Sequence, residues 1–150
     1  ALPCPRSVLF VCMGNTCRSQ MAEAILRHLC KGDIPVASAG CSPRPEVHPM
    51  AIGVMQESGV DMSSHAPKDI DMALRHIPPP TDVILVCREA REANWRQMYP
   101  ALETARFLYW PVMNPGDTEA TYEEQLRIFR KTRVKLWGRI LAWLNECESC

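Results

Sequence analysis

Residues 7–19 have the sequence Ser7-Val8-Leu9-Phe10-Val11-Cys12-Met13-Gly14-Asn15-Thr16-Cys17-Arg18-Ser19. The apolar run from Ser7 to Val11 is typical of a strand buried on both faces of a parallel sheet. The glycine and asparagine that follow predict a loop. Residues 19–30 then show helical spacing of apolar side chains, with Gly32 as a stop signal. A strand that leads through such a loop into a helix predicts the first unit of an α/β domain.

Further apolar runs and helical patterns alternate along the rest of the chain. Strands are predicted at 34–38, 82–87 and 106–110, and helices at 50–58, 69–76, 89–98 and 122–146. This alternation predicts a three-layer αβα fold, in which helices cover both faces of a four-stranded parallel sheet. Ligands of such sheets bind outside the carboxyl ends of the strands. Because no repeat or linker is found, we expect residues 1–150 to form a single domain.

The charges exclude a strongly basic or acidic surface, because 17 Lys and Arg residues balance 17 Asp and Glu residues. We therefore expect neither a nucleic-acid nor a membrane partner, and any anion must be recognised by a local loop. Residues 1–6 lack the charged-then-apolar order of a secretory signal, and the longest apolar runs are too short to cross a bilayer. A cytoplasmic protein is expected.

Eight cysteines, at positions 4, 12, 17, 30, 41, 87, 147 and 150, are many for such a chain. Neither Cys12-x4-Cys17 nor Cys147-x2-Cys150 has a second Cys or His pair at zinc-ligand spacing, so we expect no metal site. A chain of this size does not need a disulfide scaffold. Redox use of some of the thiols is the better interpretation.

The loop at Cys12 has the composition of an oxyanion site. Successive backbone N–H groups at a helix N-terminus would surround an anion and add the positive end of the helix dipole. The same groups favour the thiolate of Cys12, which makes it a nucleophile. Arg18 can hold two oxygens of a tetrahedral ion. The residues expected to bind the anion are Met13, Gly14, Asn15, Thr16, Cys17 and Arg18.

Three positions fit the geometry that this loop needs. Gly14 allows the backbone to approach closely, and Asn15 tolerates a left-handed conformation. Ser19 is expected to hydrogen-bond the Cys12 sulfur and to cap the helix. The alternative, a buried Cys12 and a surface Arg18 without function, is disfavoured by the combination of residues at these positions.

Residues 8–24 resemble the opening of the low-molecular-weight protein tyrosine phosphatase superfamily. The phosphatases tend to have Pro after the Arg-Ser pair, whereas residues 20–23, Gln-Met-Ala-Glu, are similar to the arsenate reductases that share the fold. Four further stretches agree with the reductase branch, at residues 38–40, 47–51, 59–63 and 129–133. The resemblance covers nearly the whole chain and implies that Cys12 attacks phosphorus or arsenic.

The resemblance also indicates which residues decide the step after this attack. A phosphatase protonates the leaving alcohol with an Asp, and Asn114 stands at that position here. An amide cannot transfer a proton, which disfavours phosphomonoester hydrolysis. Asp117 lies close enough in the sequence to substitute, although an acid at the start of the last helix is the favoured interpretation.

A reductase instead uses a second thiol, which attacks the Cys12–arsenate adduct and leaves a disulfide. Cys87 matches the first such cysteine of the reductase branch, whereas Asn94 stands where thioredoxin-linked members have another. The resemblance thus implies a Cys12–Cys87 disulfide. An external thiol would open it: thioredoxin, glutaredoxin or a low-molecular-weight thiol. A buried, unreactive Cys87 is the alternative.

Other thiols and charges leave further alternatives open. Cys17 is a second redox candidate, because phosphatases of this superfamily form a protective disulfide within the loop. Cys147 and Cys150 could shuttle reducing equivalents, but a frayed chain end is the favoured interpretation. Some thioredoxin-linked members bind potassium at positions resembling Asn15, Glu23, Ser38 and an Asp. Lys68 stands near that Asp, and its ammonium could occupy the place of the cation. The four histidines are expected to be structural.

Three functions follow from these observations. The leading one is an arsenate reductase-like thiol enzyme, and the second is a phosphatase that acts on phosphotyrosine or aryl phosphates. The third is a catalytically weak relative that binds phosphate. In each case the ligand is a small oxyanion or phosphotyrosine. The expected catalytic residues are Cys12, Arg18, Ser19, Cys87 and the divergent Asn114.

Overall fold

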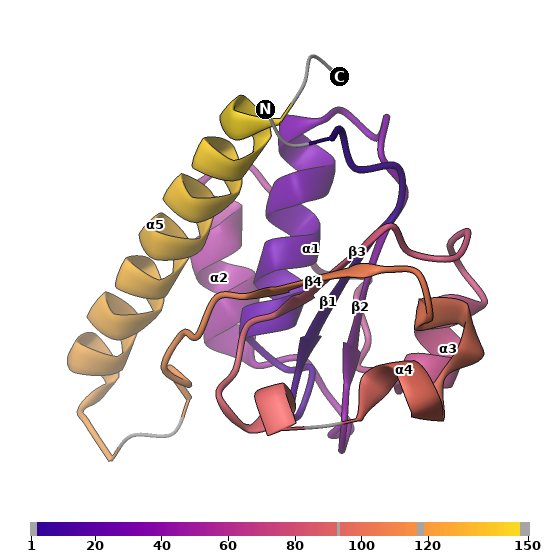
Figure 1. Ribbon diagram of the computed structural model, residues 1–150. Helices are drawn as coiled ribbons and strands as arrows, with labels where there is room; N and C mark the ends of the chain where they lie inside the picture. The colour runs from indigo at the N-terminus through magenta and orange to yellow at the C-terminus, as the bar shows by residue number, and fades with distance from the viewer. Residues whose placement is uncertain (1–2, 93, 117–118, 148–150) are drawn as a thin grey trace.

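A parallel sheet of four strands forms the centre of the molecule (Figure 1). The strands are β1 (Val8–Cys12), β2 (Val36–Gly40), β3 (Asp82–Leu85) and β4 (Arg106–Tyr109), in the spatial order β2-β1-β3-β4. Every residue of β1, β2 and β3 is buried, and apart from Asp82 all of these residues are apolar or small. The computed structural model describes residues 3–92, 94–116 and 119–147.

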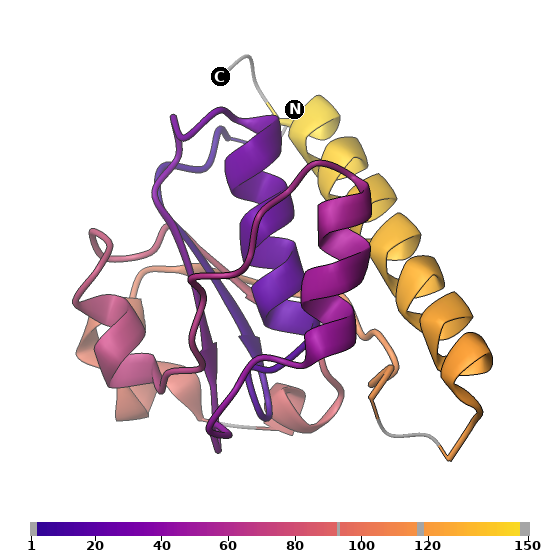
Figure 2. The ribbon, with the colours of Figure 1, turned by 180° about the vertical axis from the view of Figure 1, so that it is seen from behind.

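Helices cover both faces of this sheet, as predicted. Figures 1 and 2 show α1 (Arg18–Leu29), α2 (Pro49–Glu57) and α5 (Tyr122–Glu146) together on one face, where α5 packs against both of the others. The short helices α3 (Ile70–Leu74) and α4 (Trp95–Met98) lie on the other side, next to the 3-10 turn η2 (Pro100–Leu102). The three-layer αβα architecture is therefore confirmed.

The register of the strands brings their carboxyl ends to one edge of the sheet. Cys12, the last residue of β1, pairs with Gly40, the last residue of β2. On the other side Val11 pairs with Leu85, and the Val86 N–H donates to the Val11 carbonyl. The segments that follow all three strands, including Cys87, therefore lie around Cys12.

The predicted helix over 89–98 is wrong, because two short elements occupy this segment: the 3-10 turn η1 (Glu89–Glu92) and α4. The buried indole of Trp95 explains the break, since its Nε1–H donates to the Ala90 carbonyl at 2.8 Å. A continuous α-helix would use that carbonyl for the N–H of Asn94. The strand predicted at 34–38 begins two residues later and extends to Gly40.

Candidate active site

The oxyanion loop, residues 12–19, is held from outside by the segment that follows β2. Its carbonyl groups accept backbone hydrogen bonds from this segment, so the opposite, N–H sides of the peptide units are left to the interior of the loop. Four bonds of 2.8–3.0 Å make the connection: Cys41 to Cys12, Ser42 to Met13, Arg44 to Gly14 and His48 to Thr16. The loop is therefore shaped to receive an anion.

Asn15 fixes the turn within this loop. It has the left-handed conformation expected from the sequence, with φ of 54°, and its side chain is buried. Its Nδ2 donates to the hydroxyls of Ser19 at 2.7 Å and Ser38 at 3.0 Å. Its Oδ1 accepts from Gln20 Nε2 and from the Lys68 N–H, both at 2.9 Å. All of the side chain's polar groups are thus used to hold one backbone conformation.

Cys12 and Ser19 are in contact at the centre of the loop, with 2.7 Å between sulfur and hydroxyl oxygen. Both residues are buried. Because the Ser19 oxygen accepts from Asn15, its own hydrogen is free to point at a Cys12 thiolate. Ser19 does not cap the helix, however: α1 begins at Arg18, and Ser19 lies within its first turn. This part of the prediction was wrong.

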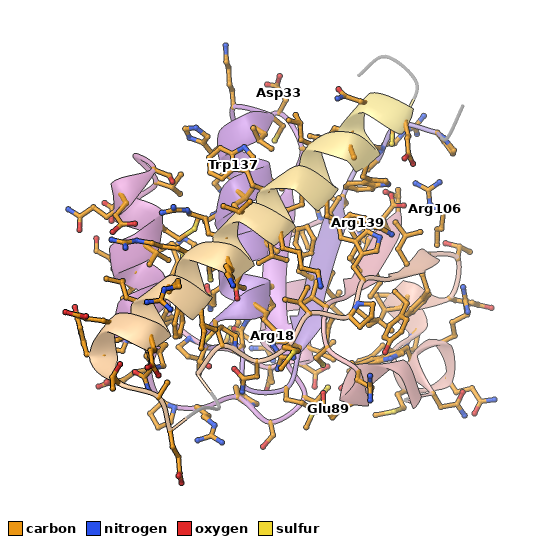
Figure 3. All side chains as sticks on the ribbon, turned by 90° about the vertical axis from the view of Figure 1, so that its left-hand side faces the viewer. Arg18, Asp33, Glu89, Arg106, Trp137 and Arg139 are labelled. Carbon is orange, nitrogen blue, oxygen red and sulfur yellow. The ribbon has the colours of Figure 1, made fainter. Side chains whose placement is uncertain are left out.

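Arg18 is 6% exposed, and its guanidinium is oriented by the carbonyl of Val112, which accepts from Nη1 at 2.9 Å. Figure 3 shows Arg18 and Glu89 near each other at the end of the molecule opposite Asp33. The other N–H groups of the Arg18 guanidinium can donate hydrogen bonds to a bound oxyanion. Two parallel N–H groups of a planar guanidinium match two oxygens of a tetrahedral ion.

The glycine that the loop requires is Gly40 rather than Gly14. A Cβ at Gly14 would meet only the flexible stem of Arg44, at 3.4 Å, and Gly14 has no positive φ. A Cβ at Gly40 would lie 2.6 Å from the Met13 carbonyl oxygen and 3.0 Å from Asn15. Close approach therefore occurs where β2 meets the loop, and the triplet at 38–40 was the sequence signal for it.

Two buried thiols flank Cys12. Burial raises the pKa of Cys17 to about 11 and that of Cys87 also to about 11, so both are protonated at neutral pH. Cys87 is within the electrostatic influence of Cys12 and Arg18. Cys41 is exposed and also lies within the electrostatic influence of Cys12. The redox candidates thus gather around the nucleophile.

Glu89 is a residue at this site that the sequence analysis missed. Its carboxylate lies within electrostatic reach of both Cys87 and Arg18. Its own backbone N–H, followed by these neighbours, lowers its pKa, so the carboxylate is charged. A Cys-x-Glu sequence directly after a buried strand was the available signal.

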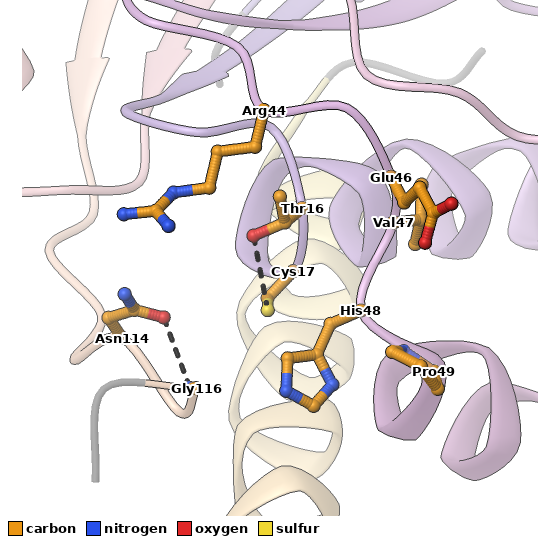
Figure 4. Close-up of a pocket in the computed structure, with 9 residues that line it drawn as sticks. All are labelled: Thr16, Cys17, Arg44, Glu46, Val47, His48, Pro49, Asn114 and Gly116. Carbon is orange, nitrogen blue, oxygen red and sulfur yellow. Dashed lines mark hydrogen bonds between the residues drawn. The ribbon is translucent and has the colours of Figure 1, made fainter.

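Asn114 faces the loop with its amide orientation fixed. Its Oδ1 accepts from the Gly116 N–H at 3.1 Å, so its Nδ2 points the other way, toward the guanidinium of Arg44 (Figure 4). Asn114 therefore presents a hydrogen-bond donor to the space between it and Arg44. Asp117, the proposed substitute, lies outside the described residues.

A cavity of about 320 Å³ opens beside the loop (Figure 4). Its lining comes from three segments: Thr16 and Cys17 of the loop, residues 44 and 46–49, and residues 114 and 116. His48, expected to be only structural, does cap α2, because its Nδ1 accepts from the Met50 N–H at 3.1 Å. Its ring also forms part of this cavity wall.

A buried ionic cluster supports the loop from behind. Glu23 accepts from Ser38 at 2.9 Å, and its carboxylate lies 3.0 Å from Arg27 and 3.4 Å from the ammonium of Lys68. Burial alone would raise its pKa, but Lys68 and its other cationic neighbours lower it. The Lys68 ammonium thus sits beside Glu23 and Ser38. Among the described residues, no group of three or more His, Cys, Asp or Glu side chains could hold a metal ion.

Cys147 is not part of a frayed end, because it follows α5 directly and is buried within the core. Cys150 lies outside the described residues. No helix within the described parts of the chain is long and apolar enough to span a membrane.

Comparison with known proteins agrees with this geometry. Residues 7–146 match the model of the family "Low molecular weight phosphotyrosine protein phosphatase". An arsenate reductase of Halalkalibacterium halodurans is 31% identical over 89% of this chain and 91% of its own length. A probable low molecular weight protein-tyrosine-phosphatase, EpsP of Ralstonia solanacearum, is 29% identical over 96% and 97%. The solved structure of an arsenate reductase in a phosphate-binding state superimposes with a TM-score of 0.73 at 30% identity, covering 95% of this chain and 99% of that one. With its buried Cys-x5-Arg loop and its matched length, the chain belongs to the low molecular weight phosphotyrosine protein phosphatase family.

Proposed function

We propose that this chain is a thiol-dependent arsenate reductase. The main observation that supports this proposal is the orientation of the Asn114 side chain. A phosphate monoester needs a proton on its leaving oxygen, and the Asn114 amide cannot supply one. In free arsenate the fourth oxygen bears no organic group, and it is a hydrogen-bond acceptor that the Asn114 Nδ2 can bind.

The first step is attack of the Cys12 thiolate on As(V). The loop N–H groups and Arg18 bind the arsenate oxygens, and Ser19 stabilises the thiolate at 2.7 Å. An S–As bond forms and one As–O bond breaks, and the departing oxygen takes its protons from solvent and leaves as water.

The second step uses Cys87, which lies beside Cys12 at the sheet edge. Cys87 loses its thiol proton to solvent, and the Cys87 thiolate attacks the Cys12 sulfur. An S–S bond forms and the S–As bond breaks, with its electron pair staying on arsenic. Arsenic becomes As(III) and leaves as arsenite, while two thiols are oxidised to a Cys12–Cys87 disulfide.

An external thiol then opens this disulfide. We place the reaction in the cytoplasm, where thioredoxin, glutaredoxin and small thiols are kept reduced. No resident cofactor is needed for this sequence of steps, because both electrons come from cysteine sulfur.

The test is a parallel assay of the reduced protein on arsenate with dithiothreitol and on an aryl phosphate. We expect arsenite production in excess of aryl phosphate turnover, and loss of arsenite production in Cys12→Ser. Aryl phosphate turnover without arsenite would favour the phosphatase, the second function that the loop suits. Phosphate binding without either turnover would indicate the catalytically weak relative.

A further inference from the structure

The cavity of about 320 Å³ beside the oxyanion loop shares Asn114, Thr16 and Cys17 with the proposed arsenate site, and the rest of its lining takes no part in the steps above. Its volume falls in the range of small-molecule sites, and it adjoins the loop that holds the nucleophile. Thr16 and Cys17 form its inner wall (Figure 4). A molecule bound there would reach the mouth of the loop.

Three hydrogen-bond donors face this cavity and have no acceptor within the part of the chain that the structure describes. The Arg44 guanidinium extends across it toward Asn114, whose Nδ2 is left free because Oδ1 serves Gly116 (Figure 4). The third donor is His48: its Nδ1 accepts from a backbone N–H, so the hydrogen is on Nε2. That ring edge faces Gly116, where a Cβ would lie 3.6 Å from Nε2.

These donors define the chemistry of a ligand. A permanent cation with two neutral donors complements a carboxylate. Glu46, on the same cavity, points away from Arg44 and is available to a cationic group (Figure 4). The cavity therefore suits a small molecule of amino-acid or peptide type rather than an apolar ring.

We propose that the cavity binds a low-molecular-weight thiol that carries a carboxylate, and that this thiol regenerates Cys12. The proposal rests on the proposed function and names its reductant. Burial favours a small reductant over a protein one, because Cys12 and Cys87 are only 2% and 0% exposed. A thiol on the surface of another folded protein could reach a disulfide between them only after the loop opens, whereas a small thiol in the cavity is already beside the loop.

The redox step is an ordinary exchange. The thiolate of the bound molecule attacks the Cys12 sulfur, the Cys12–Cys87 bond breaks, and its electron pair leaves on Cys87, which takes up a proton. A second molecule attacks the resulting mixed disulfide at the ligand sulfur and releases the Cys12 thiolate. Two small thiols are oxidised to their disulfide, and the protein disulfide is reduced to two thiols.

Binding can be tested without turnover. S-methylglutathione has the carboxylates of a peptide thiol but no reactive sulfur, and we would titrate it calorimetrically into the reduced protein. We expect saturable binding that is at least tenfold weaker in Arg44→Gln. The matched control is Arg75→Gln, an exposed arginine at the end of α3, which should bind like the wild type. No saturable binding, or equal weakening in both variants, would overturn the proposal.

Turnover provides a second test, with arsenate and either glutathione, glutathione diethyl ester or dithiothreitol as reductant. In Arg44→Gln the ratio of kcat/KM for glutathione to that for dithiothreitol should fall at least tenfold, and the diester should show no such fall. An equal loss with all three reductants, or turnover with thioredoxin but not with glutathione, would contradict the proposal. If no reductant yields arsenite, the proposed function fails, whereas the S-methylglutathione titration still decides whether the cavity binds its ligand.

Discussion

The Ser19 hydroxyl oxygen lies 2.7 Å from the Cys12 sulfur and accepts one hydrogen bond, also of 2.7 Å, from Asn15 Nδ2. The Ser19 hydrogen is therefore free to point at a Cys12 thiolate. These two contacts connect Asn15, which forms the left-handed turn of the loop, with the thiol of Cys12.

Removal of this hydroxyl should slow the first chemical step. A hydrogen bond to a charged group contributes about 1.5–3 kcal/mol, so Ser19→Ala should lower kcat/KM for arsenate by about tenfold to a hundredfold. Alkylation of Cys12 by iodoacetamide at neutral pH should slow in parallel. Ser42→Ala is the control, because only the backbone of Ser42 contacts the loop. Equal activity in the two variants would refute this role.

Gly40→Ala should damage both the fold and the site. The new Cβ would lie 2.6 Å from the Met13 carbonyl, so loop and strand must separate. We expect a loss of about 1–3 kcal/mol in the free energy of unfolding and a near-complete loss of activity. Gly53→Ala has open space within α2 and should stabilise by about 0.5–1 kcal/mol. Urea denaturation measures both, and similar stabilities would contradict the account.

Lys68→Met should destabilise the protein at neutral pH, because it leaves the buried Glu23 carboxylate with weaker compensation. The expected loss is about 1–3 kcal/mol, since Arg27 and Ser38 remain. The pKa of Glu23 is lowered in the folded state, so its ionic contribution is present above the unfolded carboxyl pKa and is lost as the pH falls below it. The difference between wild type and variant should therefore shrink toward pH 3, and Lys68→Arg should restore most of the stability. A stability difference that does not change with pH would show that the ionic interaction of Lys68 with Glu23 is not its cause.

The second chemical step should accelerate with pH. Burial raises the pKa of Cys87 to about 11, so the thiolate fraction rises about tenfold per pH unit below that value. Single-turnover formation of the disulfide should therefore be faster at pH 9 than at pH 7 by a large factor. Stopped-flow thiol titration measures the rate. A flat profile from pH 7 to 9 would show that another step or another thiol limits the reaction.

Asn114→Asp should restore a general acid and raise hydrolysis of an aryl phosphate by about a hundredfold or more. The change is isosteric, and the carboxylate can retain the bond from the Gly116 N–H. Asn145→Asp on the exposed side of α5 adds the same charge away from the site and should have no effect. An equal, unchanged rate in both variants would mean that Asn114 is not in the position of the acid.

The fold could be predicted because its core strands are almost continuously apolar. Val8–Val11 and Asp82–Leu85 are buried on both faces, and alternation with helices leaves few other arrangements. The interruption of the helix expected over 89–98 could not be predicted, because it depends on the hydrogen bond from the Trp95 indole to the Ala90 carbonyl. Such a side-chain bond competes with helix formation only once the rest of the core has formed.

The candidate site, too, could be predicted only in part. The roles of Cys12, Asn15 and Ser19 could be predicted, because the Cys12–Ser19 and Asn15–Ser19 contacts lie within one loop and Asn15 is a residue that tolerates its left-handed conformation. The role of Gly40 and the cavity at Arg44 could not, because they depend on the register of β2 against β1 and on loops far apart in the sequence. The spacing of residues in the sequence does not indicate how β2 pairs with β1.

A single-turnover experiment without reductant tests the central claim most directly. The fully reduced protein is mixed with one equivalent of arsenate, quenched by acid, and analysed for arsenite and by peptide mass spectrometry. We predict one arsenite per protein molecule, the loss of two thiols, and a peptide pair that joins Cys12 to Cys87. Arsenite formed with Cys87 still free, or no arsenite and an unchanged thiol count, would contradict the account.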